Sequence, residues 1–174
     1  DMEGPITTRG VGVRYGVILG LISIAYFLLL AVIGANFMEG WGRWSGLLLN
    51  LAILVLAQLY FRQNGDGFMS YGHGVGIAFW IGAISAFISS VFTFVYLKFI
   101  DGDFMNQIMD FQREAMEEQG LSDEQIEQAM EMAAKFTTPE MFLVFGIIGG
   151  IVSTVFVALI VTIFTQKPNQ AMPE

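Results

Sequence analysis

The sequence predicts an all-α membrane protein with four transmembrane helices and an acidic helical hairpin between the third and fourth helices. Of its 174 residues, 55% are hydrophobic and 14% are charged, which are membrane-protein proportions. Four runs of 18 to 31 residues carry no charge, and about 20 apolar residues cross a bilayer. Most of the 16 acidic residues lie in one polar stretch, Lys98 to Glu140.

The first two spans are predicted at about 13–35 and 44–61. The run Tyr15–Met38 has no charged residue, and we expect it to end as a helix near Gly34 and Glu39. Indole rings and cations gather at membrane interfaces. We therefore expect an interfacial cluster of Trp41, Arg43 and Trp44 between these spans.

The third span is predicted at about 74–97, after a turn of composition QNGDG at 63–67. Residues 67–76 contain four glycines, so we interpret residues 68–73 as an interfacial or re-entrant lead rather than as helix. The fourth span is predicted at about 141–166. Thr138 is expected to cap it and Pro139 to open it.

The polar stretch at about 101–137 is predicted to be an extramembrane helical hairpin. Apolar residues recur in it at helical spacing, and Gly120 is expected to stop its first helix. Ser122 and Gln125 have the spacing of a capping box at the start of its second helix.

Four spans place both termini on one side of the membrane. Arg9, Arg14, Arg62 and Lys167 lie on that side, and fewer cations lie close to the spans on the other. Cytoplasmic flanks carry an excess of Lys and Arg. We therefore expect cytoplasmic termini and a periplasmic acidic hairpin.

Small residues recur every four positions on three of the predicted spans. In lipid, such rows let helices approach closely. We interpret them as internal packing of one four-helix bundle, and a dimer interface is the alternative. The residues are Gly12, Gly16, Gly20, Ala78, Gly82, Ala86, Gly146 and Gly150.

Between their ends, the predicted spans contain polar residues but no charged one. Transporters coupled to protons or ions usually hold a charge near the midplane. Asn50 is interpreted as an interhelical hydrogen-bonding group rather than a substrate ligand. His73 is the single histidine, and we assign it an interfacial structural role rather than metal binding. The chain has no cysteine and a net charge of −8, which argues against cysteine chemistry and nucleic-acid binding.

The acidic hairpin has three interpretations. It is a solvated helix pair that covers the bundle, a docking surface for a partner, or a weak divalent-cation site. Methionine side chains adapt to irregular partners. If the hairpin docks a partner, the expected contact residues are Met105, Met109, Met116, Ile126 and Met130.

Four stretches together resemble one protein family. They are the run from Arg14 to Ser23, the segment Gly67–Gly74, the exit Tyr96–Asp101, and the sequence QIEQAMEM at 125–132. They are similar to the small four-span membrane proteins of Bacteroidota grouped as domain-of-unknown-function family 4199. The resemblance implies a bacterial inner membrane and no particular reaction.

From these observations we expect a non-enzymatic inner-membrane scaffold or accessory subunit. It would pack against a larger membrane complex or against itself, with the Met-rich hairpin as its contact surface. The alternative is a small transporter or channel that uses the polar faces of the third and fourth spans. We predict the lipid bilayer and another membrane protein or a second copy as partners. No catalytic residue, metal, cofactor or specific small molecule is predicted.

Overall fold

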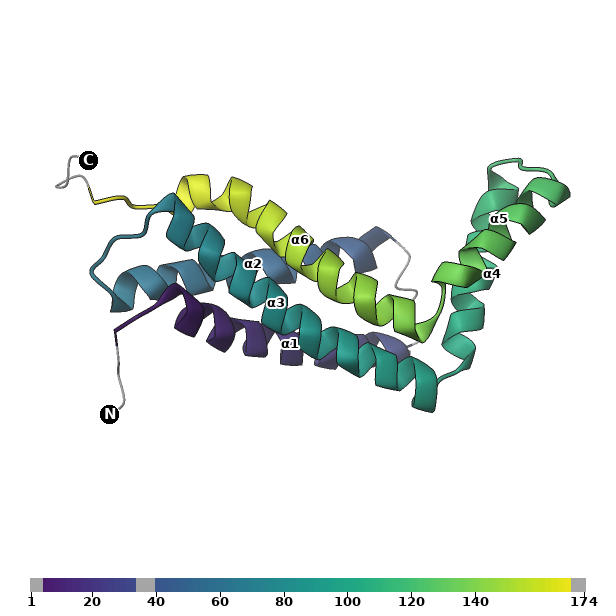
Figure 1. The fold of residues 1–174 in the computed structure, drawn as a ribbon, viewed down its shortest axis with the longest axis horizontal. Coiled ribbons are helices and arrows are strands. Elements are labelled where there is room, and N and C mark those ends of the chain that lie inside the picture. The colour runs from purple at the N-terminus through teal and green to yellow at the C-terminus, as the bar shows by residue number, and fades with distance from the viewer. Residues whose placement is uncertain (1–4, 34–39, 170–174) are drawn as a thin grey trace. The chain divides into compact units, whose positions relative to one another are not determined.

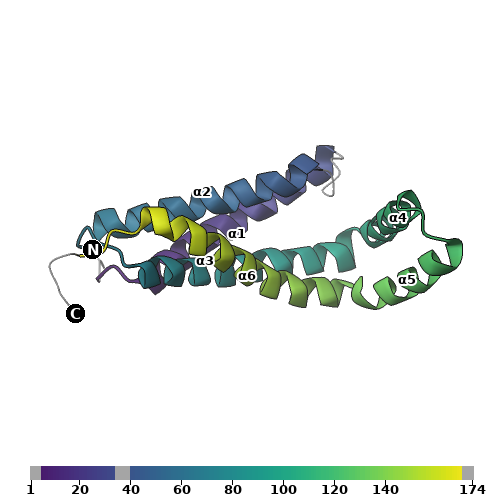
Figure 2. The same ribbon diagram turned by 90° about the horizontal axis from the view of Figure 1, so that it is seen from above.

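The computed structural model describes residues 5–33 and 40–169, with side chains of the second range described from Trp44 onward. The regular structure of these residues is helical apart from one isolated β-bridge (Figures 1 and 2). The predicted all-α fold class is therefore confirmed. The elements are α1 (Thr8–Ile33), α2 (Gly40–Asn64), α3 (Tyr71–Val95), the π-helix η1 (Tyr96–Ile100), α4 (Asp103–Glu118), α5 (Asp123–Phe136) and α6 (Pro139–Thr165).

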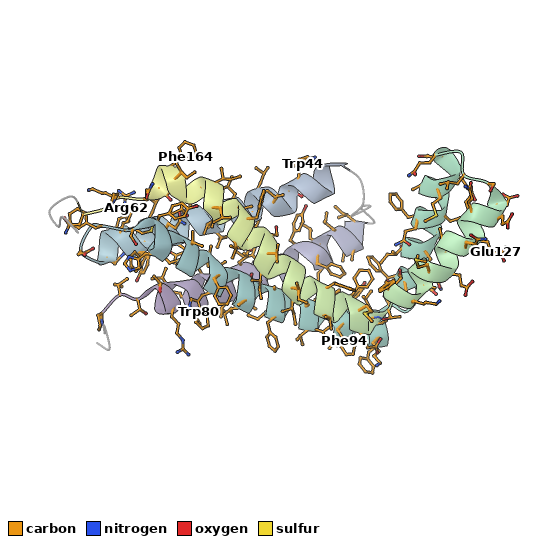
Figure 3. All side chains as sticks on the ribbon, turned by 45° about the horizontal axis from the view of Figure 1, so that its top comes forward. Trp44, Arg62, Trp80, Phe94, Glu127 and Phe164 are labelled. Carbon is orange, nitrogen blue, oxygen red and sulfur yellow. The ribbon has the colours of Figure 1, made fainter. Side chains whose placement is uncertain are left out.

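Four helical stretches are long and apolar enough to cross a membrane. They cover Thr8–Ile33, Trp44–Asn64, Tyr71–Ile100 and Pro139–Thr165, which suggests a multi-pass membrane protein. Large apolar side chains on them are exposed, as lipid-facing residues are. Phe164 is 83% exposed and points outward from α6 (Figure 3).

The chain divides into two compact units, which we describe separately. The first contains α1, α2, most of α3 and most of α6, and the second runs from Ser90 to Gly146. In the first unit, the start of α1, the end of α6 and the α2–α3 connection lie at one end (Figures 1 and 2). Its core holds fully buried Leu54, Ala57, Ile77 and Ile81, among others.

The glycine row of α1 faces α3. A Cβ atom at Gly16 would lie 2.8 Å from Ile84 Cβ and 3.1 Å from the Ile81 carbonyl oxygen. A Cβ atom at Gly12 would likewise clash with Trp80 Cβ, and one at Gly20 would lie 3.0 Å from Ile88 Cβ. These three positions therefore pack helices within the chain.

The small residues of α3 face α6. A Cβ atom at Gly150 would lie 2.5 Å from Ala86 Cβ, and one at Gly82 would lie 3.1 Å from Thr154 Cβ. Ala78 is fully buried. Partner numbers fall on α6 as they rise on α3, so the two helices are antiparallel.

The helix α3 begins at Tyr71, three residues before the predicted start of the third span. Ser70 explains the difference, because its hydroxyl accepts a hydrogen bond from the His73 amide at 3.2 Å and its carbonyl accepts one from Gly74 at 3.1 Å. A capped helix start thus replaces the expected re-entrant lead. The predicted turn is present after Asn64, and Gly67 has a φ of +85° that favours glycine.

The second unit contains η1, α4 and α5. Its expected start and stop signals are found, because Ser122 and Gln125 form the capping box and Gly120 has a φ of +76° after α4. Ser90 and Gly146 meet closely. Thr138 caps α6 through the Met141 amide at 3.2 Å.

Several predictions lie outside the described residues. They are the end of the first span at Gly34 and Glu39, and the side chains of Trp41 and Arg43. Trp44 is described, and its indole is 67% exposed (Figure 3).

Candidate functional site

A row of polar side chains on α2 faces hydroxyl groups on α6 within the first unit. Asn50 donates a hydrogen bond to Thr154 Oγ1 at 2.9 Å, and Gln58 donates one to Thr162 Oγ1 at 2.9 Å. Both pairs are separated by 104 positions in the sequence. Since the numbers rise together, α2 and α6 run in the same direction with a fixed register. The expected interhelical hydrogen bond of Asn50 is therefore present.

Gln58 makes the largest share of these contacts. Its side chain is fully buried, and its amide nitrogen also donates to the Gly74 carbonyl at 3.2 Å. Its amide oxygen accepts a hydrogen bond from Thr165 Oγ1 at 2.6 Å. Gln58 thus links α2, α3 and α6, and its polar atoms are satisfied within the protein.

Thr154 and Thr162 belong to two helix contacts at once. Each accepts a hydrogen bond from α2, and each packs on a glycine of α3: Thr154 on Gly82 and Thr162 on Gly74. We call Asn50, Gln58, Thr154, Thr162 and Thr165 the polar seam. It is a three-helix junction built from uncharged groups.

A positively charged pocket lies at the end of the polar seam. Arg62, in the last turn of α2, donates through Nη1 to the Thr165 carbonyl at 3.0 Å. A cavity of about 420 Å³ lies beside it. Its lining residues are Leu59, Arg62, Gln63, Gly65, Asp66, Gly67 and Lys167. We call this the end pocket, and no local pattern in the sequence indicates it.

The hydroxyls of α3 offer little support for a polar pathway. Ser89 donates to the Ser85 carbonyl of its own helix at 2.8 Å, and Ser85 is itself buried. In the second unit, Ser90 is buried beside Gly146.

His73 lies in the first turns of α3 and its side chain is exposed. Its ring centroid is 5.6 Å from that of Phe61 at an interplanar angle of 48°. Across residues 5–33 and 40–169, no group of three His, Cys, Asp or Glu side chains is placed to hold a metal ion.

The proposed contact residues of the polar stretch have different environments. Ile126 and Met130 are buried, at 4% and 7% exposure, whereas Met105, Met109 and Met116 are half-buried. The exposed large apolar side chains here include Phe111, Met132 and Phe136, at 36%, 64% and 55%. These three side chains are therefore more accessible to a partner than the buried Ile126 and Met130.

Comparison with known proteins identifies the family. The profile of a family described as proteins of unknown function, DUF4199, matches residues 14–167. The chain belongs to the DUF4199 family. No curated protein and no solved structure matches it.

The DUF4199 match includes the polar seam and the end pocket. It covers every residue of the polar seam and ends on Lys167, a lining residue of the end pocket. It also includes α4 and α5. The match therefore covers most of the four candidate membrane helices and the polar stretch between the third and fourth.

Proposed function

We propose that this chain is a non-enzymatic scaffold or accessory subunit of a bacterial inner membrane, and that α4 and α5 form an acidic periplasmic hairpin that contacts a partner. The supporting observation is the apolar stripe on α5. Met132 and Phe136 are one helical turn apart and are 64% and 55% exposed.

The stripe lies on a helix that is otherwise acidic. Asp123, Glu124, Glu127 and Glu131 are all exposed, as expected of a helix in water. Exposed apolar side chains on a water-facing element are typical of an interaction surface. A methionine beside an aromatic ring suits a protein partner, because thioethers adapt in shape and aromatic rings anchor interfaces.

The polar seam supports a scaffold over a transporter. Its amide and hydroxyl groups bond to one another across helices, so Gln58 and Thr162 hold the bundle together rather than facing a substrate. A small transporter or channel is the competing function. It predicts solute flux from the purified protein alone.

The accessory role is tested by native mass spectrometry of the assembly, extracted at its natural expression level in mild detergent. We expect stoichiometric chains of other proteins with the wild type, and their loss from the double variant Met132→Ser, Phe136→Ser. The control, Glu127→Gln with Ala134→Ser, changes exposed residues on other faces of α5 and retains the partner. A lone monomer, a homo-oligomer, or flux in liposomes contradicts the accessory role.

The orientation has its own test, because the chain contains no cysteine. A single Glu127→Cys substitution on exposed α5 is expected to react with a membrane-impermeant maleimide added to intact spheroplasts. Asn64→Cys, at the end of α2, is expected to react only after the membrane is opened. The reverse pattern contradicts a periplasmic hairpin.

A further inference from the structure

The end pocket combines a cavity with an incompletely bonded guanidinium group. Nη1 of Arg62 is held by the Thr165 carbonyl at 3.0 Å. Nε of Arg62 is buried and has no hydrogen-bond partner among the described residues. A buried donor without a partner is costly, and the planar donors of arginine match phosphate oxygens. Arg62 is only partly buried and lines the cavity, so its guanidinium group can offer donors to an acceptor bound there.

The second cation of the end pocket is placed by the backbone. The amide of Lys167 donates to the Met69 carbonyl, and the amide of Met69 donates to the Lys167 carbonyl, both at 2.8 Å. Met69 is buried, with 1% exposure. The ammonium group of Lys167 lies 5.8 Å from the centroid of the Phe68 ring. Lys167 is therefore fixed beside the cavity although it follows the end of α6.

The charge of the end pocket favours an anion. Arg62 and Lys167 contribute two positive charges to its lining, and Asp66 contributes one negative charge. The carboxylate Oδ1 of Asp66 accepts a hydrogen bond from the Phe68 amide at 3.0 Å. Asp66 thus has a structural task in the turn, and the lining has a net positive charge.

An exposed apolar stripe on α2 leads to the end pocket. Leu48, Ala52 and Leu56 are exposed and lie on the same helical face as the pocket residues Leu59 and Gln63. At 1.5 Å per residue, the stripe from Leu48 to Leu59 is roughly 16 Å long, about half the hydrocarbon thickness of a bilayer. A free phosphate ion cannot make apolar contacts with such a surface, but an acyl chain can.

We propose that the end pocket binds the phosphate group of a membrane phospholipid, with Arg62 and Lys167 as its ligands and an acyl chain lying along Leu48, Ala52 and Leu56. Basic pockets at the ends of transmembrane helices recognise lipid headgroups in this way. The site lies at the membrane surface shared by the start of α1 and the end of α6. The inference requires the membrane spans and does not depend on the accessory role.

The test is native mass spectrometry of the full chain in detergent, titrated with dioleoyl phosphatidylglycerol. We expect one lipid to be retained at low molar ratio. Lys167→Gln should weaken its apparent affinity about fivefold, since a cation near a lipid phosphate contributes about 1 kcal/mol. Lys167→Arg should restore binding. The backbone bridge to Met69 does not involve the lysine side chain, so these variants are expected to fold.

Two control variants separate this site from general attraction of lipid to cations. Arg9→Gln removes an exposed cation at the same end of the bundle, where Arg9 lies over the Trp80 ring at 5.3 Å, and should leave lipid retention unchanged. Asp66→Asn keeps an acceptor for the Phe68 amide but removes the negative charge, and should retain or tighten the lipid.

The outcomes are distinct. Equal losses with Arg9→Gln and Lys167→Gln, or no loss with Lys167→Gln, overturn the proposal. Inorganic phosphate, tested at millimolar concentration, should neither bind nor displace the lipid. If it displaces the lipid, the site recognises free phosphate and the proposal is wrong. Absence of accessory chains from the wild-type assembly, with lipid binding as expected, would contradict the proposed function alone.

Discussion

The first unit contains two pairs of parallel helices, α1 with α3 and α2 with α6. The two pairs are held together by different kinds of contact. Between α1 and α3, glycines such as Gly16 have no side chain, so the backbone and side chains of α3 can approach α1 closely. Between α2 and α6, side chains form hydrogen bonds across 104 to 107 positions of the sequence. One contact depends on the absence of side chains, and the other depends on their chemistry.

The difference shows two ways of fixing register in lipid. Hydrophobicity does not distinguish a neighbouring helix from an acyl chain, so close packing and hydrogen bonding decide which faces meet. The contact of α1 with α3 has no room for larger side chains. The contact of α2 with α6 accommodates side chains, and its specificity depends on pairing a few polar groups.

The largest expected effect comes from filling the glycine row. Gly16→Leu should destabilise the bundle by about 3 kcal/mol, since overpacking costs about 1–3 kcal/mol and occasionally more. The clash involves the Ile81 backbone as well as Ile84, so a rotamer change alone cannot relieve it. Unfolding in mixed micelles, followed by circular dichroism, measures the loss.

Gly149→Leu is the matched control for this substitution. Apart from the neighbouring backbone of its own helix, no atom lies within 4 Å of a Cβ atom built at Gly149 on α6, so the substitution should not reduce stability. Equal losses from the two leucine variants would mean that the α1–α3 contact is not tightly packed.

The next effect tests the centre of the polar seam. Gln58→Leu removes hydrogen bonds to Gly74, Thr162 and Thr165. We expect a loss of about 1–2 kcal/mol, the range found for polar contacts between model transmembrane helices. The same micelle unfolding assay applies. A neutral result would show that shape alone holds α2 against α6.

A smaller effect is expected at Asn50, where one hydrogen bond joins α2 to α6. A double-mutant cycle of Asn50→Leu and Thr154→Val should give a coupling of about 0.6 kcal/mol, the average for such bonds in a membrane protein. Asn50 Oδ1 is buried without a partner among the described residues, so the leucine also relieves a desolvation cost. Zero coupling contradicts the pairing.

The smallest effect is expected where the two helix pairs meet at an exposed site. Tyr60 of α2 accepts a hydrogen bond from Arg14 of α1 at 2.9 Å. Tyr60→Phe removes this bond but keeps the ring, which lies 4.9 Å from the guanidinium carbon. Stability should change by less than about 0.5 kcal/mol. A larger loss would make this contact a third determinant of the bundle.

The glycine rows could be predicted because their signal is local. Gly12, Gly16 and Gly20 repeat every fourth residue, and this spacing alone places them on one helical face. The helix signals at Ser122 and Thr138 are local too. The middle of each span follows from a run without charge, although the first three helical stretches extend past Arg14, Arg62 and Lys98.

The polar seam and the end pocket could not be assembled from such signals. Gln58 and Thr162 are both visible as polar residues within spans, but nothing local pairs residues 104 positions apart. The sequence indicates that Arg62 and Lys167 flank spans, but it does not indicate that they share one site. The Ser70 cap is not evident from the sequence, because the glycines that follow it have low helix propensity. Their presence favours an irregular lead instead.

The backbone bridge between Met69 and Lys167 also has a consequence for biosynthesis. These residues are made almost a hundred positions apart, and the amide and carbonyl of Met69 are buried against a partner that leaves the ribosome only after all four spans. The connection between the second and third spans therefore cannot reach its final bonded state during their insertion. The bridge that closes this end of the first unit therefore forms only after residue 167 has been synthesised.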